Sequence, residues 1–222
     1  HNEYSFGVGK GVNVAVQCLG TQPVTIQFED ASTQTTEEGE RVVIEGFTDA
    51  PTVATSHLVG SYNFTNIAAA VAFGKFFKLS NEAIKRGIEA YIPQNNRSQL
   101  LQWGSNTVLL DAYNANPTSM KAALENFMKM DVEHKMVILG DMRELGEVSN
   151  SEHQKICDLL KSAQFDCVWL VGKEFMATQN DFKSFENVEQ VIAELQQTAV
   201  QNFCILVKGS NGIGLACLKD AL

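Results

Sequence analysis

Thr107-Val108-Leu109-Leu110-Asp111-Ala112-Tyr113-Asn114-Ala115-Asn116-Pro117 is the stretch that decides the fold. Its first residues form a short, continuous and β-rich apolar run, which is typical of a strand buried on both faces. A polar turn follows directly. Asn116 is a suitable N-cap and Pro117 a suitable first helical residue, so we expect a helix from here to about Met130. The stretch therefore predicts one strand–turn–helix unit.

The same alternation continues along the rest of the chain. Further buried strands are predicted at 135–140, 167–171 and 203–208. Helices are predicted from Ser149, where Ser149 and Glu152 would form a capping box, over the amphipathic segment 187–200, and over 213–222. Alternating strands and helices predict an α/β domain at 98–222. Its sheet would be doubly wound and mostly parallel, or Rossmann-like, with right-handed crossovers.

The first 92 residues have a different pattern. Short apolar runs at 12–16, 24–28, 41–45 and 53–55 are divided by turn-rich stretches, which predicts a small antiparallel meander. Two helices should follow, the first over 63–77. It is apolar almost all round, so we expect it to be buried. The second should run from an N-cap at Ser80 to about Tyr91. Residues 93–97 form a short polar linker between the two parts.

Composition and charge exclude several classes of protein. The 222 residues carry 17 Lys and Arg against 26 Asp and Glu, for a net charge of −9. An acidic chain without basic clusters argues against nucleic-acid binding. No apolar run approaches the ~20 residues of a membrane helix. The five cysteines form no C-x-x-C pair, and no His lies at metal-ligand spacing from them. We expect reduced thiols, a cytoplasmic location and no metal site.

The chain opens at His1 without an initiator Met or a signal peptide. We therefore expect it to be a piece of a longer protein. The nearby segment Gly7-Val8-Gly9-Lys10-Gly11 imitates a phosphate-binding loop. It lacks the earlier Gly and the Ser or Thr after Lys that such a loop needs, so we interpret it as a flexible turn.

Polar residues follow the strands, at the edge of the sheet where ligands bind in this class of fold. The first strand leads to Asp111, Tyr113, Asn114 and Asn116. A carboxylate at this position suits ribose hydroxyls. The alternative is that the two asparagines only cap the helix and shape the turn.

The other strand ends offer two more candidate segments. Residues 140–147 carry Asp141, Glu144 and further charges, which suit a polar ligand or a solvated turn. His153 either faces the same cleft or is a solvent-exposed helix residue. The segment 208–214 begins Lys208-Gly209-Ser210, and its glycines predict an anion-binding nest. Its G-x-x-G-x-G order is not that of a dinucleotide site.

Several segments together resemble the Mur ligase family. Residues 58–70 resemble the family's G-x-H-N-x-x-N-x-x-A-A, with Tyr62 in place of the His. Arg97 resembles the arginine at the family's domain junction, and Asp111 its ribose-binding aspartate. The segments 111–120, 139–147 and 208–210, with His153, are most similar to the branch that adds D-alanyl-D-alanine to UDP-N-acetylmuramoyl-tripeptide. Other Mur-type or folylpolyglutamate-type ligases, and a non-catalytic nucleotide-binding module, are the alternatives.

The resemblance implies an ATP-dependent, amide-forming ligase of peptidoglycan precursor synthesis with three domains. Residues 1–92 would be the end of the central ATPase domain, and 98–222 the whole C-terminal domain. The chain has no G-x-x-x-x-G-K-[ST]. We therefore expect the phosphate-binding loop and the Mg²⁺ ligands to lie outside it, and the chain alone to be inactive. The whole enzyme is expected to be a monomer.

The resemblance also assigns roles to residues, all of them supporting rather than catalytic. Nucleotide binding would fall to Asn63, Asn66, Arg97, Asp111, Tyr113 and Asn114. Substrate binding would fall to Asn116, Ser119, Asp141, Glu144, Lys208 and Ser210. The aromatic ring of Tyr62 could still stack on adenine.

Overall fold

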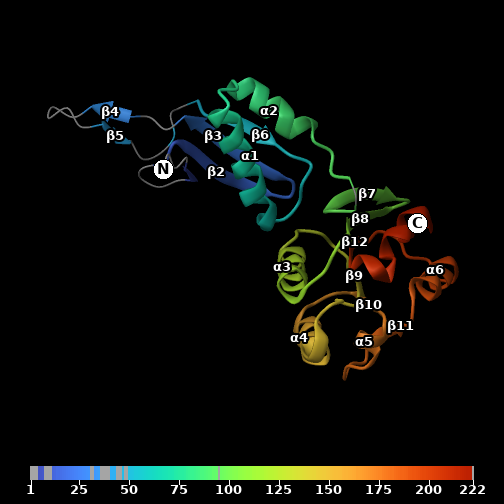
Figure 1. Cartoon of the computed structure of the whole chain (residues 1–222). Coiled ribbons are helices and arrows are strands. Elements are labelled where there is room, and N and C mark those ends of the chain that lie inside the picture. The colour runs from blue at the N-terminus through green and yellow to red at the C-terminus, as the bar shows by residue number, and fades with distance from the viewer. Residues whose placement is uncertain are drawn as a thin grey trace. The chain divides into compact units, whose positions relative to one another are not determined.

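The computed structural model describes residues 5–7, 12–30, 33–35, 41–43, 47, 50–94 and 96–221 (Figure 1). The chain divides into two compact units, residues 1–92 and residues 93–222. Each unit is described by itself. The residues Val8 to Gly11, which resemble part of a phosphate-binding loop, lie outside the described residues.

The first unit is built on a small, mostly antiparallel sheet. Its strand order is β1 (Phe6–Gly7), β2 (Val14–Thr21), β3 (Val24–Asp30) and β6 (Thr52–Thr55). β3 pairs antiparallel with both β2 and β6, and β1 pairs parallel with β2. The predicted antiparallel meander is confirmed for β2, β3 and β6, whereas β1 was not predicted. The run at 41–45 instead contributes β5 (Arg41–Val43), which pairs with β4 (Thr33–Thr35) as a separate ladder.

Two helices cover one face of this sheet. α1 (Phe64–Phe76) follows the 3₁₀ turn Ser61–Asn63, and α2 (Asn81–Ala90) begins at the predicted cap. The Ser80 hydroxyl accepts a hydrogen bond from the Ala83 N–H at 3.2 Å. α1 packs Ile67 and Val71 into the apolar core formed with the strands. The expected burial of the segment 63–77 is found on the side that faces the sheet, whereas Phe73 is 66% and Phe77 69% exposed.

The second unit contains the predicted parallel sheet. Five strands run parallel: β8 (Asn106–Asp111), β9 (Lys135–Gly140), β10 (Cys167–Val171), β11 (Lys183–Phe185) and β12 (Cys204–Lys208). β7 (Gln99–Trp103) adds an antiparallel edge, so the order is β11-β10-β9-β12-β8-β7. The predicted α/β class is confirmed. β7 and β11 were not predicted, because β7 is half polar and β11 is only three residues long.

Helices cover both faces of this sheet (Figure 1). α3 (Pro117–Met128) and α4 (Ser149–Ser162) lie on one side, and α6 (Val188–Gln197) lies on the other. The short helices are α5 (Lys173–Met176) and α7 (Leu218–Ala221). Alternate residues of each central strand face the two helical layers. For example, Ile138 joins the cluster that contains Val191 of α6. Burial on both faces explains the continuous apolar runs of the strands.

Two helix boundaries differ from the predictions. Ser149 and Glu152 form no capping box, because the 3₁₀ turn Gly146–Val148 runs directly into α4 and leaves Ser149 with helical dihedral angles. The Ser149 hydroxyl donates instead to Glu174 Oε2 at 2.6 Å. The predicted helix at 213–222 is broken into 3₁₀ turns before α7, because Gly214 adopts a left-handed conformation with φ of 81°.

Candidate functional site

The polar strand ends of the second unit meet at a topological switch point. β12 lies between β8 and β9 in the sheet. The chain leaves β8 and β9 toward α3 and α4 on one face, whereas β11 returns to β12 through α6 on the other face (Figure 1). Such a crevice, at the carboxyl ends of parallel strands, is where ligands bind in open α/β sheets.

A buried ion pair joins the two strands at this point. In the parallel register Lys208 is the partner of Asp111. Lys208 Nζ donates to Asp111 Oδ2 at 2.6 Å, and the two side chains are 2% and 16% exposed. The other carboxylate oxygen, Oδ1, accepts the Ser98 N–H at 3.2 Å. Asp111, at the end of β8, therefore binds both Ser98 near the start of the second unit and Lys208 at the end of β12. The contact with Ser98, which has a positive φ of 47°, had no signal in the sequence.

Lys208 is fully engaged by the protein. Besides the carboxylate, its Nζ donates to the Asn114 carbonyl oxygen at 3.3 Å. The resemblance implies that Lys208 handles a substrate. The structure places its ammonium group in the interior, where it neutralises Asp111 and binds the turn after β8.

The exposed part of the crevice carries an aromatic ring and a cation. The guanidinium carbon of Arg97 lies 3.8 Å from the centroid of the Tyr113 ring, which is a cation–π contact. Tyr113 remains 45% exposed. The structure thus brings together three of the predicted nucleotide-binding residues, Arg97, Asp111 and Tyr113, within one short stretch of surface.

The asparagines of this turn have local structural roles. Asn114 Oδ1 accepts the N–H of Ala115 at 2.9 Å. Asn116 Oδ1 accepts the Ser119 N–H at 2.8 Å, and the Ser119 hydroxyl accepts the Asn116 N–H at 3.1 Å. Asn116 and Ser119 therefore form a reciprocal cap at the start of α3, which is one of the two alternatives that the sequence leaves open.

Replacing Asn116 with Ala should lower the free energy of unfolding by about 1 kcal/mol, because the first turn of α3 loses its cap. Asn116→Asp keeps a side-chain oxygen that can accept from Ser119 and should stay close to wild type. Urea unfolding of the two variants checks this. Equal loss in both variants would contradict a capping role and would favour a role of the amide nitrogen.

Asp141 is also held by the protein. Its carboxylate oxygens Oδ2 and Oδ1 accept the N–H groups of Glu174 and Phe175, both at 3.0 Å, and so cap α5 from a neighbouring strand end. The side chain is buried. Burial raises the pKa of this carboxyl above its ordinary value, although the two N–H donors act in the opposite direction.

His153 is buried beside Asp141, so it is not a solvent-exposed helix residue. Its Nε2 accepts the Met142 N–H at 2.9 Å, and its Nδ1 lies 2.8 Å from the Ser149 carbonyl oxygen. These contacts require a neutral ring with the proton on Nδ1, since a carbonyl oxygen can only accept. The ring thereby fastens the backbone after β9 to the first turn of α4.

Stability should depend on pH through Asp141. A carboxyl whose pKa is raised on folding binds its proton more tightly in the folded state. The protonated carboxyl therefore adds its full contribution to the free energy of unfolding below the pKa of the unfolded state, about 3.9. That contribution is lost as pH rises through the pKa of the folded state. The unfolding free energy of wild type should fall relative to Asp141→Asn as pH rises from about 3.5, by at most ~1.4 kcal/mol per pH unit. Urea unfolding of both proteins between pH 3.5 and 8 measures this. A relative gain with rising pH would contradict it.

Ser210 connects all three strand ends. Its hydroxyl accepts the Arg143 N–H at 2.8 Å and donates to the Ala115 carbonyl oxygen at 3.3 Å. Its own N–H donates to the Asp141 carbonyl oxygen at 3.1 Å. The sequence predicts an anion-binding nest here. In the structure the buried hydroxyl is used within the protein, and the helical segment that follows is a single 3₁₀ turn, Asn211–Ile213.

Glu144 is exposed, unlike the predicted substrate residues Asp141, Lys208 and Ser210, which are buried. It adopts a left-handed backbone conformation with φ of 66°, which costs free energy for a residue with a side chain. Among the interactions of the described residues, none engages its carboxylate. Glu144 is therefore an accessible acid in the loop after β9.

The predicted nucleotide residues of the first unit lie at the start of α1. Asn63 is buried, and its Nδ2 donates to the Val59 carbonyl oxygen at 2.8 Å. Asn66 is exposed, and its Nδ2 lies 3.4 Å from Asn63 Oδ1. The ring of Tyr62 lies against Gly60, where an added Cβ would come within 2.5 Å of it. Of the two asparagines, Asn66 is the accessible one.

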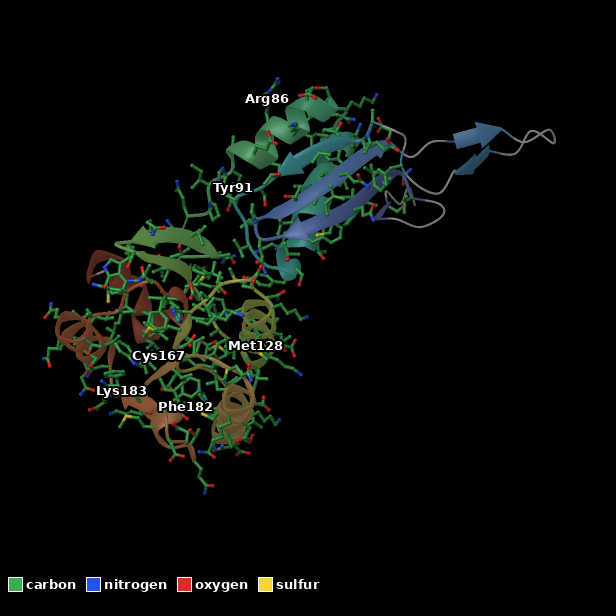
Figure 2. The ribbon with its side chains drawn as sticks, turned by 180° about the vertical axis from the view of Figure 1, so that it is seen from behind. Arg86, Tyr91, Met128, Cys167, Phe182 and Lys183 are labelled. Carbon is green, nitrogen blue, oxygen red and sulfur yellow. The ribbon has the colours of Figure 1, made fainter. Side chains whose placement is uncertain are left out.

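The described residues contain no group of three or more His, Cys, Asp or Glu side chains that could hold a metal ion. In the described part of the chain, no cysteine takes part in a disulfide. Burial raises the pKa of Cys157, Cys204 and Cys167, the last of which is labelled in Figure 2, and this makes them poor nucleophiles. No helix in the described part of the chain has the length and apolar character that crossing a bilayer requires.

Comparison with known proteins places this geometry in a family. Residues 96–211, more than half of the chain, match the profile described as "Mur ligase, glutamate ligase domain". The chain is 29% identical, over 209 residues, to the UDP-N-acetylmuramoyl-tripeptide–D-alanyl-D-alanine ligase of Bacillus subtilis. That match covers 88% of this chain and 44% of the relative. The chain thus spans less than half the length of this relative.

Solved structures agree with this placement. A crystal structure of MurF from Acinetobacter baumannii superposes with a TM-score of 0.72 at 25% identity, covering 98% of this chain and 46% of that one. A MurF ligase from Thermotoga maritima in complex with ADP has the same fold, with a TM-score of 0.70 at 16% identity, covering 97% of this chain and 47% of that one. Together with the matched profile, these similarities show that the chain belongs to the Mur ligase family.

Proposed function

We propose that this chain is part of an ATP-dependent ligase that joins D-alanyl-D-alanine to UDP-N-acetylmuramoyl-tripeptide. The observation that carries the proposal is the group Arg97, Asp111 and Tyr113 at the switch point of the sheet, where a nucleotide would bind. The names of the related ligases support the choice of substrates.

The two units correspond, in this proposal, to parts of two domains. Residues 1–92 form the end of the central ATPase domain, residues 93–97 the linker, and residues 98–222 the C-terminal domain. The division of the structure at residues 92 and 93 supports this arrangement. The C-terminal domain would close over the nucleotide as the substrates bind.

The nucleotide would be ATP, bound as a substrate. Arg97, Asp111, Tyr113 and Asn114 would hold the ribose and the base, and Asn66 would contact the adenine side, with Asn63 orienting it. These side chains suit this role. The Tyr113 ring is exposed and can stack on a base, and Lys208 and Ser98 hold the Asp111 carboxylate in place. No residue of this chain is assigned to Mg²⁺, which would stabilise the charge on the transferred phosphoryl group.

The reaction would have two steps. A carboxylate oxygen of the tripeptide attacks the terminal phosphorus of ATP, which forms an acyl phosphate and releases ADP. The amine nitrogen of D-alanyl-D-alanine then attacks the acyl carbon, loses a proton, and expels inorganic phosphate as the amide bond forms. The residues of this chain would contribute by positioning the reactants rather than by covalent chemistry.

Glu144 is the residue that we propose for contact with the amine of the dipeptide. Among the predicted substrate residues it is the exposed acid, whereas Asp141, Lys208 and Ser210 are buried and engaged. These three, with Asn116 and Ser119, would then support the substrate indirectly by fixing the loops around it.

Nucleotide binding can be tested on the 222-residue chain. Tyr113→Leu should weaken ADP binding about tenfold, because stacking on a base is worth about 1–3 kcal/mol. Tyr91→Leu is the matched control, since Tyr91, labelled in Figure 2, is a similarly exposed tyrosine at the end of α2. Isothermal titration would measure both. An equal effect of the two substitutions would contradict the proposed site.

Activity requires the longer polypeptide that carries this chain. Turnover with ATP, the UDP-linked tripeptide and D-alanyl-D-alanine is the direct test. A preference for a single amino acid such as glutamate would reassign the protein to another branch of the family. Glu144→Gln should raise KM for the dipeptide, whereas Glu147→Gln in the same loop should not.

A further inference from the structure

One loop of the second unit presents two opposite charges side by side. Arg143 and Glu144 are consecutive residues in the loop that follows β9, and both are exposed. Among the ion pairs of the described residues, none joins these two side chains to each other or involves either of them. Both charges therefore face solvent and are accessible to a ligand.

Arg143 differs from the other basic residues at this edge of the parallel sheet. Lys208 ends β12, and Lys173 follows β10. Lys208 binds Asp111 and Lys173 binds Glu186, so each of these two ammonium groups already has a carboxylate partner within the chain. The guanidinium group of Arg143 has no such partner among the described residues. It is therefore the cation at the strand ends that can accept an anionic group from outside.

The guanidinium group of Arg143 lies against Gly212, in the 3₁₀ turn after β12. A Cβ added to Gly212 would come within 2.3 Å of Arg143 Nη1 and 2.7 Å of Cζ. Gly212 has no positive φ, so its backbone conformation does not require glycine. The missing side chain instead leaves room for the guanidinium group. Because β9 and β12 are neighbouring strands, the group lies across the carboxyl ends of both.

The backbone that carries this side chain is fixed on both sides. The Met142 N–H donates to His153 Nε2 at 2.9 Å, and the Arg143 N–H donates to the Ser210 hydroxyl at 2.8 Å. His153 and Ser210 are both buried. A side chain that starts from an anchored backbone and rests on a neighbouring turn loses less freedom when a ligand binds.

The two charges suit a zwitterionic ligand. The planar fork of a guanidinium group matches a carboxylate, and the carboxylate of Glu144 matches an ammonium group. The charged ends of an extended dipeptide lie about 7 Å apart, which two long side chains on consecutive residues can span. A polyphosphate is disfavoured here, because the exposed acids Glu144 and Glu147 outnumber the single cation of the loop.

We propose that Arg143 binds the carboxylate of the amine substrate while Glu144 faces its ammonium group. The inference rests on the proposed function and adds a residue that determines specificity. Lys208 cannot take this role, because its ammonium group is buried against Asp111. The enzyme should therefore select amines that carry a free carboxylate and reject those whose carboxyl group is blocked.

The test uses the longer polypeptide that carries this chain and compares D-alanyl-D-alanine with D-alanyl-D-alaninamide, which has no carboxylate. Wild type should show a kcat/KM at least about tenfold higher for the free acid, because a charge-assisted bond is lost with the amide. Arg143→Gln should lower kcat/KM for the acid about tenfold and change that for the amide less than about twofold. Arg86→Gln is the control, since Arg86, labelled in Figure 2, is an exposed arginine of α2.

A second variant displaces the guanidinium group without removing its charge. In Gly212→Ala the new Cβ would overlap Arg143 Nη1, so the end of the arginine side chain must move. This variant should also lose most of the preference for the acid over the amide. Its Tm should stay within about 2 °C of wild type, because the displaced atoms belong to a flexible, exposed side chain.

Equal losses for the acid and the amide in Arg143→Gln would overturn the inference, since a purely structural role would affect both substrates. A raised KM for ATP with the preference for the acid retained would also overturn it and would assign Arg143 to a phosphate. A wild-type preference for a single amino acid would contradict the proposed function alone, and that amino acid and its amide would then be compared. Absence of turnover with every amine that carries a carboxylate would overturn both.

Discussion

Replacing Lys208 with Met is expected to lower the free energy of unfolding of this chain by about 3 kcal/mol. The substitution keeps most of the side-chain volume but removes the ammonium group that binds Asp111 Oδ2 at 2.6 Å. The carboxylate is then left largely buried, with the Ser98 N–H as its remaining hydrogen-bond donor among the described residues. Uncompensated burial of one member of such a pair is among the costliest single changes in a protein. Urea unfolding monitored by circular dichroism measures the loss.

Two further variants test whether burial of the ion pair causes this loss of stability. Lys155 forms an ion pair with Glu152 at the same distance, 2.6 Å, but its side chain is 67% exposed. Lys155→Met should therefore cost less than about 0.5 kcal/mol. Asp111→Asn combined with Lys208→Met should recover at least ~1 kcal/mol relative to Lys208→Met alone, because no buried charge remains. If Lys208→Met and Lys155→Met cost the same, the pair at the strand ends is not buried in solution.

Replacing Gly172 with Ala is expected to cost about 3 kcal/mol or more. Gly172 follows β10 with φ of 120° and ψ of 164°, a region that is essentially restricted to glycine. A Cβ at this position would lie 2.2 Å from Asp141 Oδ2. The substitution therefore strains the backbone and displaces the carboxylate that caps α5. Thermal unfolding should show a fall in Tm of about 6 °C or more.

Gly87 supplies the matched control for this glycine. It lies inside α2, and an added Cβ there meets nothing within 4 Å. Gly87→Ala should raise stability by about 0.5–1 kcal/mol, since alanine is the better helix former. A loss at Gly87 as large as that at Gly172 would contradict the account based on φ and on Asp141.

The fold of the second unit could be predicted from local pattern. Strands buried on both faces need apolar residues at every position, so the runs at 135–140 and 167–171 predicted β9 and β10 with their observed bounds. Asn116 and Ser80 predicted helix starts because a cap is a contact over three residues of sequence. Ser149 failed as a cap for a local reason, because a preceding 3₁₀ turn already occupied the cap position.

The candidate site was predictable only as a set of residues. Its members follow strands, and a strand end is visible in the sequence. Their roles were not visible, because Lys208 and Asp111 lie 97 residues apart and meet only through the register of β12 on β8. The same holds for Asp141 and the amides of Glu174 and Phe175, more than 30 residues away.

The sequence by itself therefore determined the α/β class, the positions of most strands and helices, and the resemblance to the Mur ligases. These depend on periodicity and on short motifs, which are properties of neighbouring residues. The tertiary structure alone decided which polar groups are buried and bonded within the protein and which remain accessible to a ligand. Burial and hydrogen bonding depend on contacts between segments that are distant in the sequence. As a result, Lys208, Asp141 and His153 lie in the interior. Tyr113, Glu144 and Asn66 lie at the surface.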